Sequence, residues 1–209
     1  MLEGIQVLCH SSIRIKREKV IYIDPFRIQE EYHDAYIILI THDHYDHYSE
    51  EDIDKIKKEN TIIVVPEQLL EKVIKLGFEK DNIMIVKPNE KYEIEGMQIE
   101  TIPAYNVNKP FHPKQNGWVG YILVIEGIRY YIAGDTDITQ ENQNVKCDVA
   151  FVPVGGTYTM DSKEAAKLAN HILPKMAVPI HYGEIVGTKQ DAIDFANLLD
   201  SEIACKILI

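Results

Sequence analysis

The sequence is short of the features that mark several protein classes. Its 209 residues include only three cysteines, Cys9, Cys147 and Cys205. An odd, widely spaced set without a CxxC pair predicts neither a disulfide framework nor a thiolate metal site. Such thiols are typical of reduced proteins, so we expect a cytoplasmic protein. No GxSxG motif occurs, and Cys9 and His10 are adjacent in the chain, which disfavours catalysis by a serine or cysteine nucleophile.

Long apolar runs and positive charge are also scarce. Runs such as Tyr36–Ile40 are far below the roughly 18 residues that a membrane span needs. The first residues carry neither the basic stretch nor the apolar core of a signal peptide. Lys and Arg number 22 against 33 Asp and Glu, a net charge of −11 that disfavours contact with nucleic-acid phosphates. We therefore expect a small-molecule substrate, and neither a nucleic acid nor a membrane as partner.

The remaining composition is that of an ordinary folded domain. Hydrophobic residues make up 45% and charged residues 26% of the chain, which indicates a single globular domain over residues 1–209. Short apolar strands alternate with amphipathic helices, and Glu95-Gly96 and Glu126-Gly127 are typical of hairpin turns. This α/β pattern favours two facing mixed sheets with outer helices. We also expect a hairpin region at Arg14–Arg17, a helix capped by Ser49 and a strand at Lys206–Leu208.

Four residues that bind metals in proteins stand close together after a buried strand. His42, His44, Asp46 and His47 follow the apolar run Ala35–Ile40 within six residues. In extended chain the side chains of His42 and His44 point to the same side, so they can bind one ion. Asp46 and His47 lie in the following loop and can turn toward a second ion. Imidazole and carboxylate groups suit zinc, iron or manganese.

The spacing of these residues resembles a known family signature. His42-x-His44-x-Asp46-His47 is similar to the HxHxDH motif of the metallo-β-lactamase superfamily. Cys9–Ser12 and Ile23–Pro25 resemble the opening of its small UlaG-like branch, that of ascorbate-6-phosphate lactonase and its relatives. Gly134–Asp137 resembles the bridging-aspartate motif, and Pro179–Gly183 resembles the last ligand motif.

The resemblance implies an αββα sandwich that holds two divalent metal ions, zinc first and manganese or iron as alternatives. It also implies hydrolysis of a small ester, lactone or phosphodiester by a hydroxide that bridges the metals, with Asp46 orienting that hydroxide. His112 is the third-motif candidate because it is the only histidine between His47 and His171. The implied ligands are His42, His44 and His112 for the first metal, Asp46, His47 and His181 for the second, and Asp135 for both.

Five further residues lie beside these motifs. We expect Asp24 to accept a hydrogen bond from a ligand histidine, as metal sites commonly require. His10 is either a strand-end histidine or a side chain beside the metals. Tyr105, Trp118 and Tyr158 either pack against the motif loops or wall a substrate pocket.

Two other functions remain open. One is a mononuclear iron oxygenase on the same fold, which the presence of all three second-site residues, Asp46, His47 and His181, disfavours. The other is a metal-binding sensor or scaffold without turnover, which intact ligands do not exclude.

Overall fold

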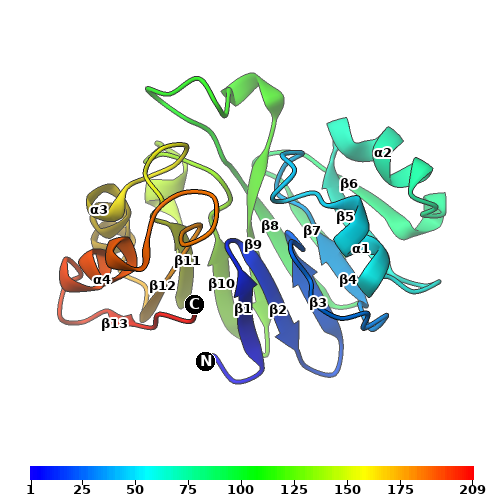
Figure 1. The fold of residues 1–209 in the computed structure, drawn as a ribbon, viewed down its shortest axis with the longest axis horizontal. Coiled ribbons are helices and arrows are strands. Elements are labelled where there is room, and N and C mark those ends of the chain that lie inside the picture. Colours follow the sequence, from blue (N-terminus) through cyan, green and yellow to red (C-terminus); the bar gives the residue numbers. More distant parts are fainter. The chain divides into compact units, whose positions relative to one another are not determined.

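The structure is a computed structural model that describes residues 1–209. The chain forms two compact units, here called the amino-terminal unit (Leu2–Val86) and the carboxy-terminal unit (Lys87–Ile209, with Met1). Each unit contains one mixed β-sheet and two α-helices (Figure 1). The α/β class and the two mixed sheets are therefore confirmed, while the single domain over residues 1–209 stays a prediction.

The amino-terminal unit has a six-stranded sheet in the order β1-β2-β3-β4-β5-β6. The first three strands form an antiparallel meander, and the next three join it in parallel. Parallel strands need crossover connections, and their carboxyl ends meet at one edge of the sheet. The strands are β1 (Ile5–Cys9), β2 (Ser12–Lys16), β3 (Val20–Ile23), β4 (Ile37–Leu39), β5 (Ile62–Pro66) and β6 (Ile83–Val86).

Helices α1 (Glu50–Ile56) and α2 (Leu70–Lys75) lie beside strands β4 to β6 of this sheet (Figure 1). The core there includes Ile53, Val73, Ile38 and Ile63, all fully buried. Ser49 caps α1 as expected, because its side chain accepts a hydrogen bond from the backbone of Asp52. Short 3₁₀ turns complete the chain: η1 (Glu67–Leu69) and η2 (Lys80–Asn82) here, η3 (Lys114–Asn116) and η4 (Asn142–Asn144) in the other unit.

The hairpin region expected at Arg14–Arg17 contains a further strand, because Arg14 lies inside β2, which pairs antiparallel with both β1 and β3. Arg14 is only 8% exposed. Its guanidinium pairs with the carboxylate of Asp34 and lies 4.4 Å from the ring centre of Tyr32. A basic residue at a buried strand position is stable only when such partners are present, and these partners come from a distant part of the chain.

The carboxy-terminal unit has a seven-stranded sheet in the order β13-β12-β11-β10-β9-β8-β7. Strands β7 to β10 are antiparallel neighbours, and β10 to β13 are parallel. The last strand lies earlier than the expected Lys206–Leu208, because Ala204 and Cys205 pair with β12. The strands are β7 (Lys91–Ile94), β8 (Met97–Pro103), β9 (Val119–Ile125), β10 (Ile128–Ile132), β11 (Val149–Pro153), β12 (Met176–Ile180) and β13 (Ala204–Cys205).

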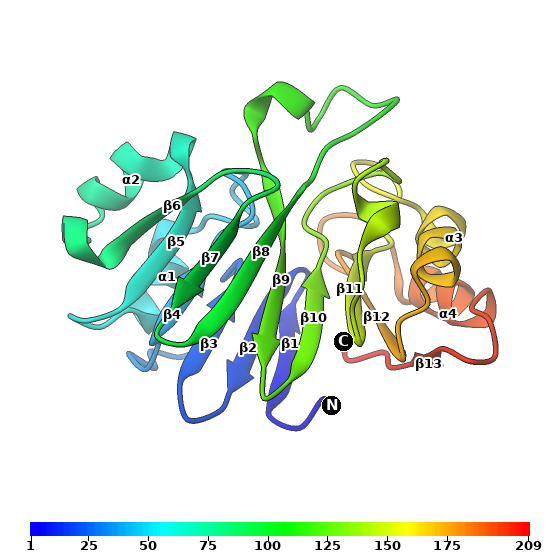
Figure 2. The same cartoon turned by 180° about the vertical axis from the view of Figure 1, so that it is seen from behind.

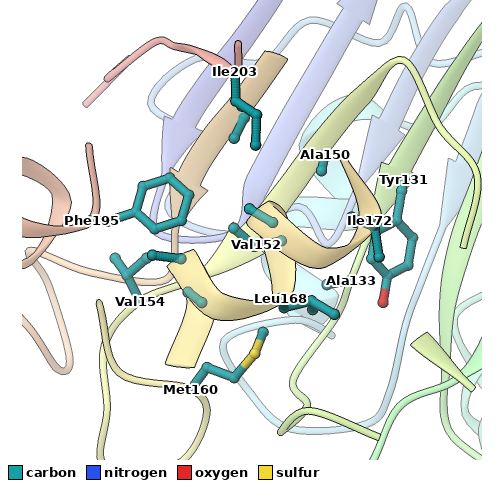
Figure 3. Close-up of a cluster of buried hydrophobic side chains, with 14 of the residues drawn as sticks. Tyr131, Ala133, Ala150, Val152, Val154, Met160, Leu168, Ile172, Phe195 and Ile203 are labelled. Carbon is teal, nitrogen blue, oxygen red and sulfur yellow. The ribbon is translucent and has the colours of Figure 1, made fainter. Parts of the chain in front are cut away.

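Helices α3 (Ser162–Ile172) and α4 (Lys189–Asn197) lie beside β11 and β12 (Figure 2). Figure 3 shows Leu168 and Ile172 of α3 and Phe195 of α4 in one cluster with the strand residues Val152 and Ala150. All of these side chains are at most 4% exposed. This apolar layer fixes the strands whose ends carry the residues described below.

The amino terminus of α3 is closed by a reciprocal pair of hydrogen bonds. The Asp161 carboxylate accepts from the backbone of Glu164, and the Glu164 side chain accepts from the backbone of Asp161. Replacing Asp161 by alanine is expected to lower the free energy of unfolding by about 1 kcal/mol, because an N-cap side chain is lost. Urea denaturation measures the change. Glu202→Ala, at an exposed residue outside any helix, is the control and is expected to change little; an equal loss in both variants would contradict the capping role.

No helix in the structure combines the length and the apolar character needed to cross a bilayer. All three cysteines are free thiols. Burial raises the pKa of Cys147 to about 12, so its thiol stays protonated at neutral pH.

Candidate metal centre

Two neighbouring parallel strands of the amino-terminal unit lead to a buried carboxylate. Asp24, directly after β3, is 1% exposed and has a φ of 47°, a left-handed conformation that few residues other than glycine adopt. Its Oδ1 accepts from the Thr41 backbone N–H at 2.8 Å, and its Oδ2 accepts from the Thr41 hydroxyl at 2.7 Å. These bonds hold the beginning of the loop Thr41–His47 against the end of β3.

The same bonds determine which ring nitrogen of two histidines carries the proton. His47 Nδ1 lies 2.7 Å from Asp24 Oδ2. A carboxylate only accepts hydrogen bonds, so Nδ1 carries the proton and the lone pair is on Nε2. Because the Thr41 hydroxyl gives its proton to Asp24, its oxygen accepts from His42 Nδ1 at 2.9 Å. Both imidazoles therefore present Nε2 as a ligand atom.

These Nε2 atoms face other ligand atoms of the loop. His42 Nε2 lies 3.1 Å from His44 Nδ1, and His47 Nε2 lies 3.5 Å from Asp46 Oδ2. His42, His47 and Asp46 are all buried, at 1%, 0% and 7% exposure. A lone pair that faces a carboxylate in a buried place is stable only with a cation, either a proton or a metal, close to both. The loop therefore brings together ligand atoms that could hold a cation.

His10, at the turn between β1 and β2, lies next to this loop. It is fully buried and has a φ of 54°. Its Nε2 is 3.4 Å from Asp46 Oδ2, and its ring meets the His47 ring edge-on at 6.5 Å between centres. The structure thus brings His10 beside two predicted ligands.

In the carboxy-terminal unit, two predicted histidine ligands approach one carboxylate oxygen of a third predicted ligand. Asp135 follows β10, and its Oδ2 lies 3.2 Å from His112 Nε2 and 3.0 Å from His181 Nε2. All three side chains are at most 3% exposed. His181, directly after β12, has a φ of 60°. Gly155 makes room for it, because a Cβ at Gly155 would lie 2.4 Å from the His181 carbonyl oxygen.

The predicted ligands of each unit carry donor atoms that fit divalent metal ions. Imidazole nitrogens and carboxylate oxygens suit zinc, iron and manganese. The ligand atoms of His42 and His44 lie within 4.8 Å of each other, as do those of His112 and Asp135. Several of the imidazoles also bond through Nδ1 to a second residue, an arrangement typical of metal-binding histidines.

The three aromatic residues predicted near the site have different surroundings. Trp118 is 7% exposed and packs edge-on against the His112 ring, 5.6 Å between centres. Tyr105 donates to a carboxylate oxygen of Glu141 at 2.7 Å, and burial together with this bond raises the pKa of Tyr105. Tyr158 meets Phe111 edge-on at 4.8 Å between ring centres. Their part in substrate binding stays a prediction.

Sequence reasoning missed two residues that orient predicted ligands, Thr41 and Asn106. Thr41 connects Asp24 to His42, and Asn106 Oδ1 lies 3.0 Å from His112 Nδ1. Thr41 stands beside the HxHxDH motif, which is a usable signal. Asn106 lies six residues before His112, but its residue type alone does not distinguish it from an ordinary loop asparagine.

One hollow of the carboxy-terminal unit lies away from these residues. It has a volume of about 580 Å³ and is lined by residues that include Ile138, Lys167, His171 and Leu198. None of the predicted metal ligands lines it, so it is not the predicted substrate site.

Comparison with known proteins identifies the family. The sequence profile described as Beta-lactamase superfamily domain matches residues 4–181. A UPF0173 metal-dependent hydrolase of Thermococcus kodakarensis is 29% identical, and the alignment covers 98% of this chain and 95% of that protein.

Two solved structures are similar over nearly the whole chain. A protein of Parabacteroides distasonis assigned as a metal-dependent hydrolase has 32% sequence identity and a TM-score of 0.82, covering 98% of this chain and 91% of its own. A metallo hydrolase of Ignicoccus hospitalis has 21% identity and a TM-score of 0.80, covering 97% and 93%, and supports the fold alone. The family resemblance suggested by the HxHxDH motif is thereby confirmed, and the chain is a member of the metallo-β-lactamase superfamily.

Proposed function

We propose that this chain is a metal-dependent hydrolase that uses two divalent ions, zinc first, to cleave a small ester or lactone. The proposal places His42, His44 and His112 on one ion, Asp46, His47 and His181 on the other, and Asp135 on both. These ligands occur in the order of the family's motifs, and the single domain over residues 1–209 is part of the proposal. Relatives that align over almost the full chain are named metal-dependent hydrolases.

One observation carries the proposal: buried imidazole lone pairs are directed at other ligand atoms. His112 and His181 both approach the same oxygen of Asp135, at 3.2 and 3.0 Å. His42 and His44 approach each other through ring nitrogens at 3.1 Å. These contacts bring imidazole nitrogens and a carboxylate oxygen together in a buried place, and histidine with carboxylate is a ligand set of catalytic zinc sites.

Bound divalent ions supply a hydroxide at neutral pH and stabilise negative charge on the substrate oxygen. The chain's own residues have separate tasks. Asp24 and Thr41 keep His42 and His47 in the tautomer that presents Nε2. Asp46, 7% exposed, would accept a hydrogen bond from the attacking water. His10, 3.4 Å from Asp46, helps to fix its orientation.

The charges near His112 favour an ester or lactone over a phosphorylated substrate. Lys109 and Lys114 are the cations of the loop that carries His112. Lys109 pairs with Asp137 at 2.7 Å, and Lys114 pairs with Glu141 at 2.7 Å. Because both ammonium groups are neutralised within their unit, they are poor receptors for a substrate phosphate. A relation to the UlaG-like lactonase branch agrees with this preference and remains part of the proposal.

Metal counting and a substrate panel test the proposal together. Elemental analysis of the purified protein is expected to find two zinc ions per chain, falling toward one in His181→Ala. The zinc-loaded protein is expected to cleave p-nitrophenyl acetate and a γ-lactone faster than bis(p-nitrophenyl) phosphate.

Three results would count against it. One iron ion per chain, unchanged in His181→Ala, would favour an oxygenase and direct the work to oxygen consumption. Two metals with no turnover of any substrate would favour a sensor or scaffold. Preferred cleavage of bis(p-nitrophenyl) phosphate would refute the assignment to esters and lactones.

A further inference from the structure

We infer that Asn106 is the positioning residue that prepares His112 for metal binding. Its carboxamide oxygen accepts a hydrogen bond from His112 Nδ1 and so leaves the lone pair on Nε2, the atom that faces Asp135. The inference rests on the proposed role of His112 as a ligand. It concerns only residues of the carboxy-terminal unit.

The orientation of the Asn106 amide follows from its partners. Oδ1 lies 3.0 Å from the His112 backbone nitrogen, and a backbone N–H can only donate, so the oxygen faces His112. Nδ2 donates to the Tyr158 carbonyl oxygen at 2.9 Å and to Asp137 Oδ1 at 3.2 Å, which can only accept. Three independent partners therefore agree, and the His112 Nδ1 atom, 3.0 Å from the same oxygen, must be the donor.

This amide belongs to a buried network that joins the loops after β8, β10 and β11. Asn106, His112 and Asp137 are 7%, 1% and 6% exposed. The Asn106 backbone N–H also donates to the His112 carbonyl oxygen at 2.8 Å. Asp137 is held in turn by Lys109, whose ammonium also donates to the Thr159 carbonyl oxygen at 2.8 Å. A group bonded on all sides has little freedom to rotate, so the His112 ring is fixed in its place.

The network also explains why this position holds an amide. An aspartate at position 106 would place a second carboxylate about 3.2 Å from Asp137 Oδ1, where like charges repel in a buried place. The amide avoids this charge and donates to both acceptors. His47, in contrast, is backed by the Asp24 carboxylate. A carboxylate raises the basicity of its imidazole, so His112 is expected to be the weaker ligand of the two.

Zinc affinity tests the inference, measured by competition with a chromophoric chelator in the full chain. Asn106→Leu keeps the approximate volume and removes the hydrogen bonds. It is expected to weaken, by roughly 10- to 100-fold, the zinc equivalent that His112→Ala abolishes, as loss of a ligand's orienting partner does elsewhere. The other equivalent is expected to be unchanged. Asn144→Leu, which removes an exposed amide in the same unit, is the matched control.

Two further variants test whether Asn106 acts on His112 through its hydrogen bonds or only through packing. Asn106→Asp is expected to weaken zinc binding because it faces Asp137. Adding Asp137→Asn removes the second charge, and the carboxylate at 106 still accepts from His112. Because Asp137 Oδ1 also accepts from Lys109, the double variant is expected to recover part of the lost affinity. If it binds zinc no better than Asn106→Asp, the proposed hydrogen-bond pattern is wrong.

The tautomer itself is the second measurement. In the metal-free protein with ¹⁵N-labelled histidine, two-bond proton–nitrogen NMR spectra are expected to show His112 protonated at Nδ1, and Asn106→Leu is expected to lose that preference. If His112→Ala loses no zinc, the ligand assignment fails and the inference fails with it. If His112→Ala loses one equivalent while Asn106→Leu keeps both the wild-type affinity and the wild-type tautomer, only the inference fails.

Discussion

Replacing Asp135 by asparagine is expected to reduce kcat for ester hydrolysis by roughly 10³-fold or more. Asp135 is the carboxylate on which His112 and His181 both converge, and it is 3% exposed. Asparagine has nearly the same shape but no charge, and its N–H group cannot serve as a metal ligand. Loss of a metal's electrostatic contribution costs several kcal/mol, and about 4 kcal/mol corresponds to 10³ in rate.

The measurement combines kinetics with metal analysis of the same preparation. Asp148→Asn is the matched control, since it makes the same substitution in the same unit. Asp148 pairs with Lys175 at 2.8 Å and accepts from the Arg129 backbone at 2.9 Å, away from the predicted ligands. The control is expected to retain two zinc ions and full activity. Wild-type zinc content together with a wild-type rate in Asp135→Asn would show that Asp135 is not a metal ligand of this site.

The fold could be predicted where the pattern is local. The predicted turn at Glu126-Gly127 joins β9 to β10, and Ser49 caps helix α1 as predicted. The strand β2 was missed because Arg14 is charged, and its burial depends on Asp34 and Tyr32, which a local pattern does not reveal. Local signals thus predict where elements begin and end, while partners that are distant in sequence decide which charged residues are buried.

The candidate site also contains residues that the sequence could predict and residues that it could not. His42, His44, Asp46 and His47 could be found because one loop carries them all with a regular spacing. Asp24 could be singled out from its place before Pro25 and from the family resemblance. Asn106 could not, because its role depends on the path of the loop that returns His112 to it, and no residue type predicts that path.

The second large effect is expected at Asp24. Substitution by asparagine removes the charge of its side chain, and substitution by alanine also removes its hydrogen bonds. In Asp24→Asn the backbone is expected to stay in place, since asparagine tolerates the left-handed conformation that a φ of 47° requires. Its Oδ1 still accepts from the Thr41 backbone, but an N–H₂ group replaces the Oδ2 that faces His47. His47 must then accept through Nδ1 and carry its proton on Nε2, where it blocks coordination. Zinc affinity is expected to fall roughly 10- to 100-fold.

Asp24→Ala is expected to destabilise the fold as well. It leaves the Thr41 N–H, the Thr41 hydroxyl and His47 Nδ1 without their acceptor, at about 1–3 kcal/mol for each buried donor. The free energy of unfolding in urea, measured without metal, should fall by about 3 kcal/mol or more in Asp24→Ala and by less in Asp24→Asn.

Asp43→Asn tests whether these effects belong to Asp24 or to any charge of the motif region. Asp43 lies in the same loop, between His42 and His44, but its side chain is 30% exposed and pairs with Lys72 at 3.1 Å. Removing an exposed ion pair changes stability by about 0–1 kcal/mol, and zinc affinity is expected to stay at the wild-type value. If Asp43→Asn weakened zinc as much as Asp24→Asn, general electrostatic attraction would explain the loss. If only Asp24→Asn weakens it, with the fold intact, the protonation state of His47 is what the buried carboxylate controls.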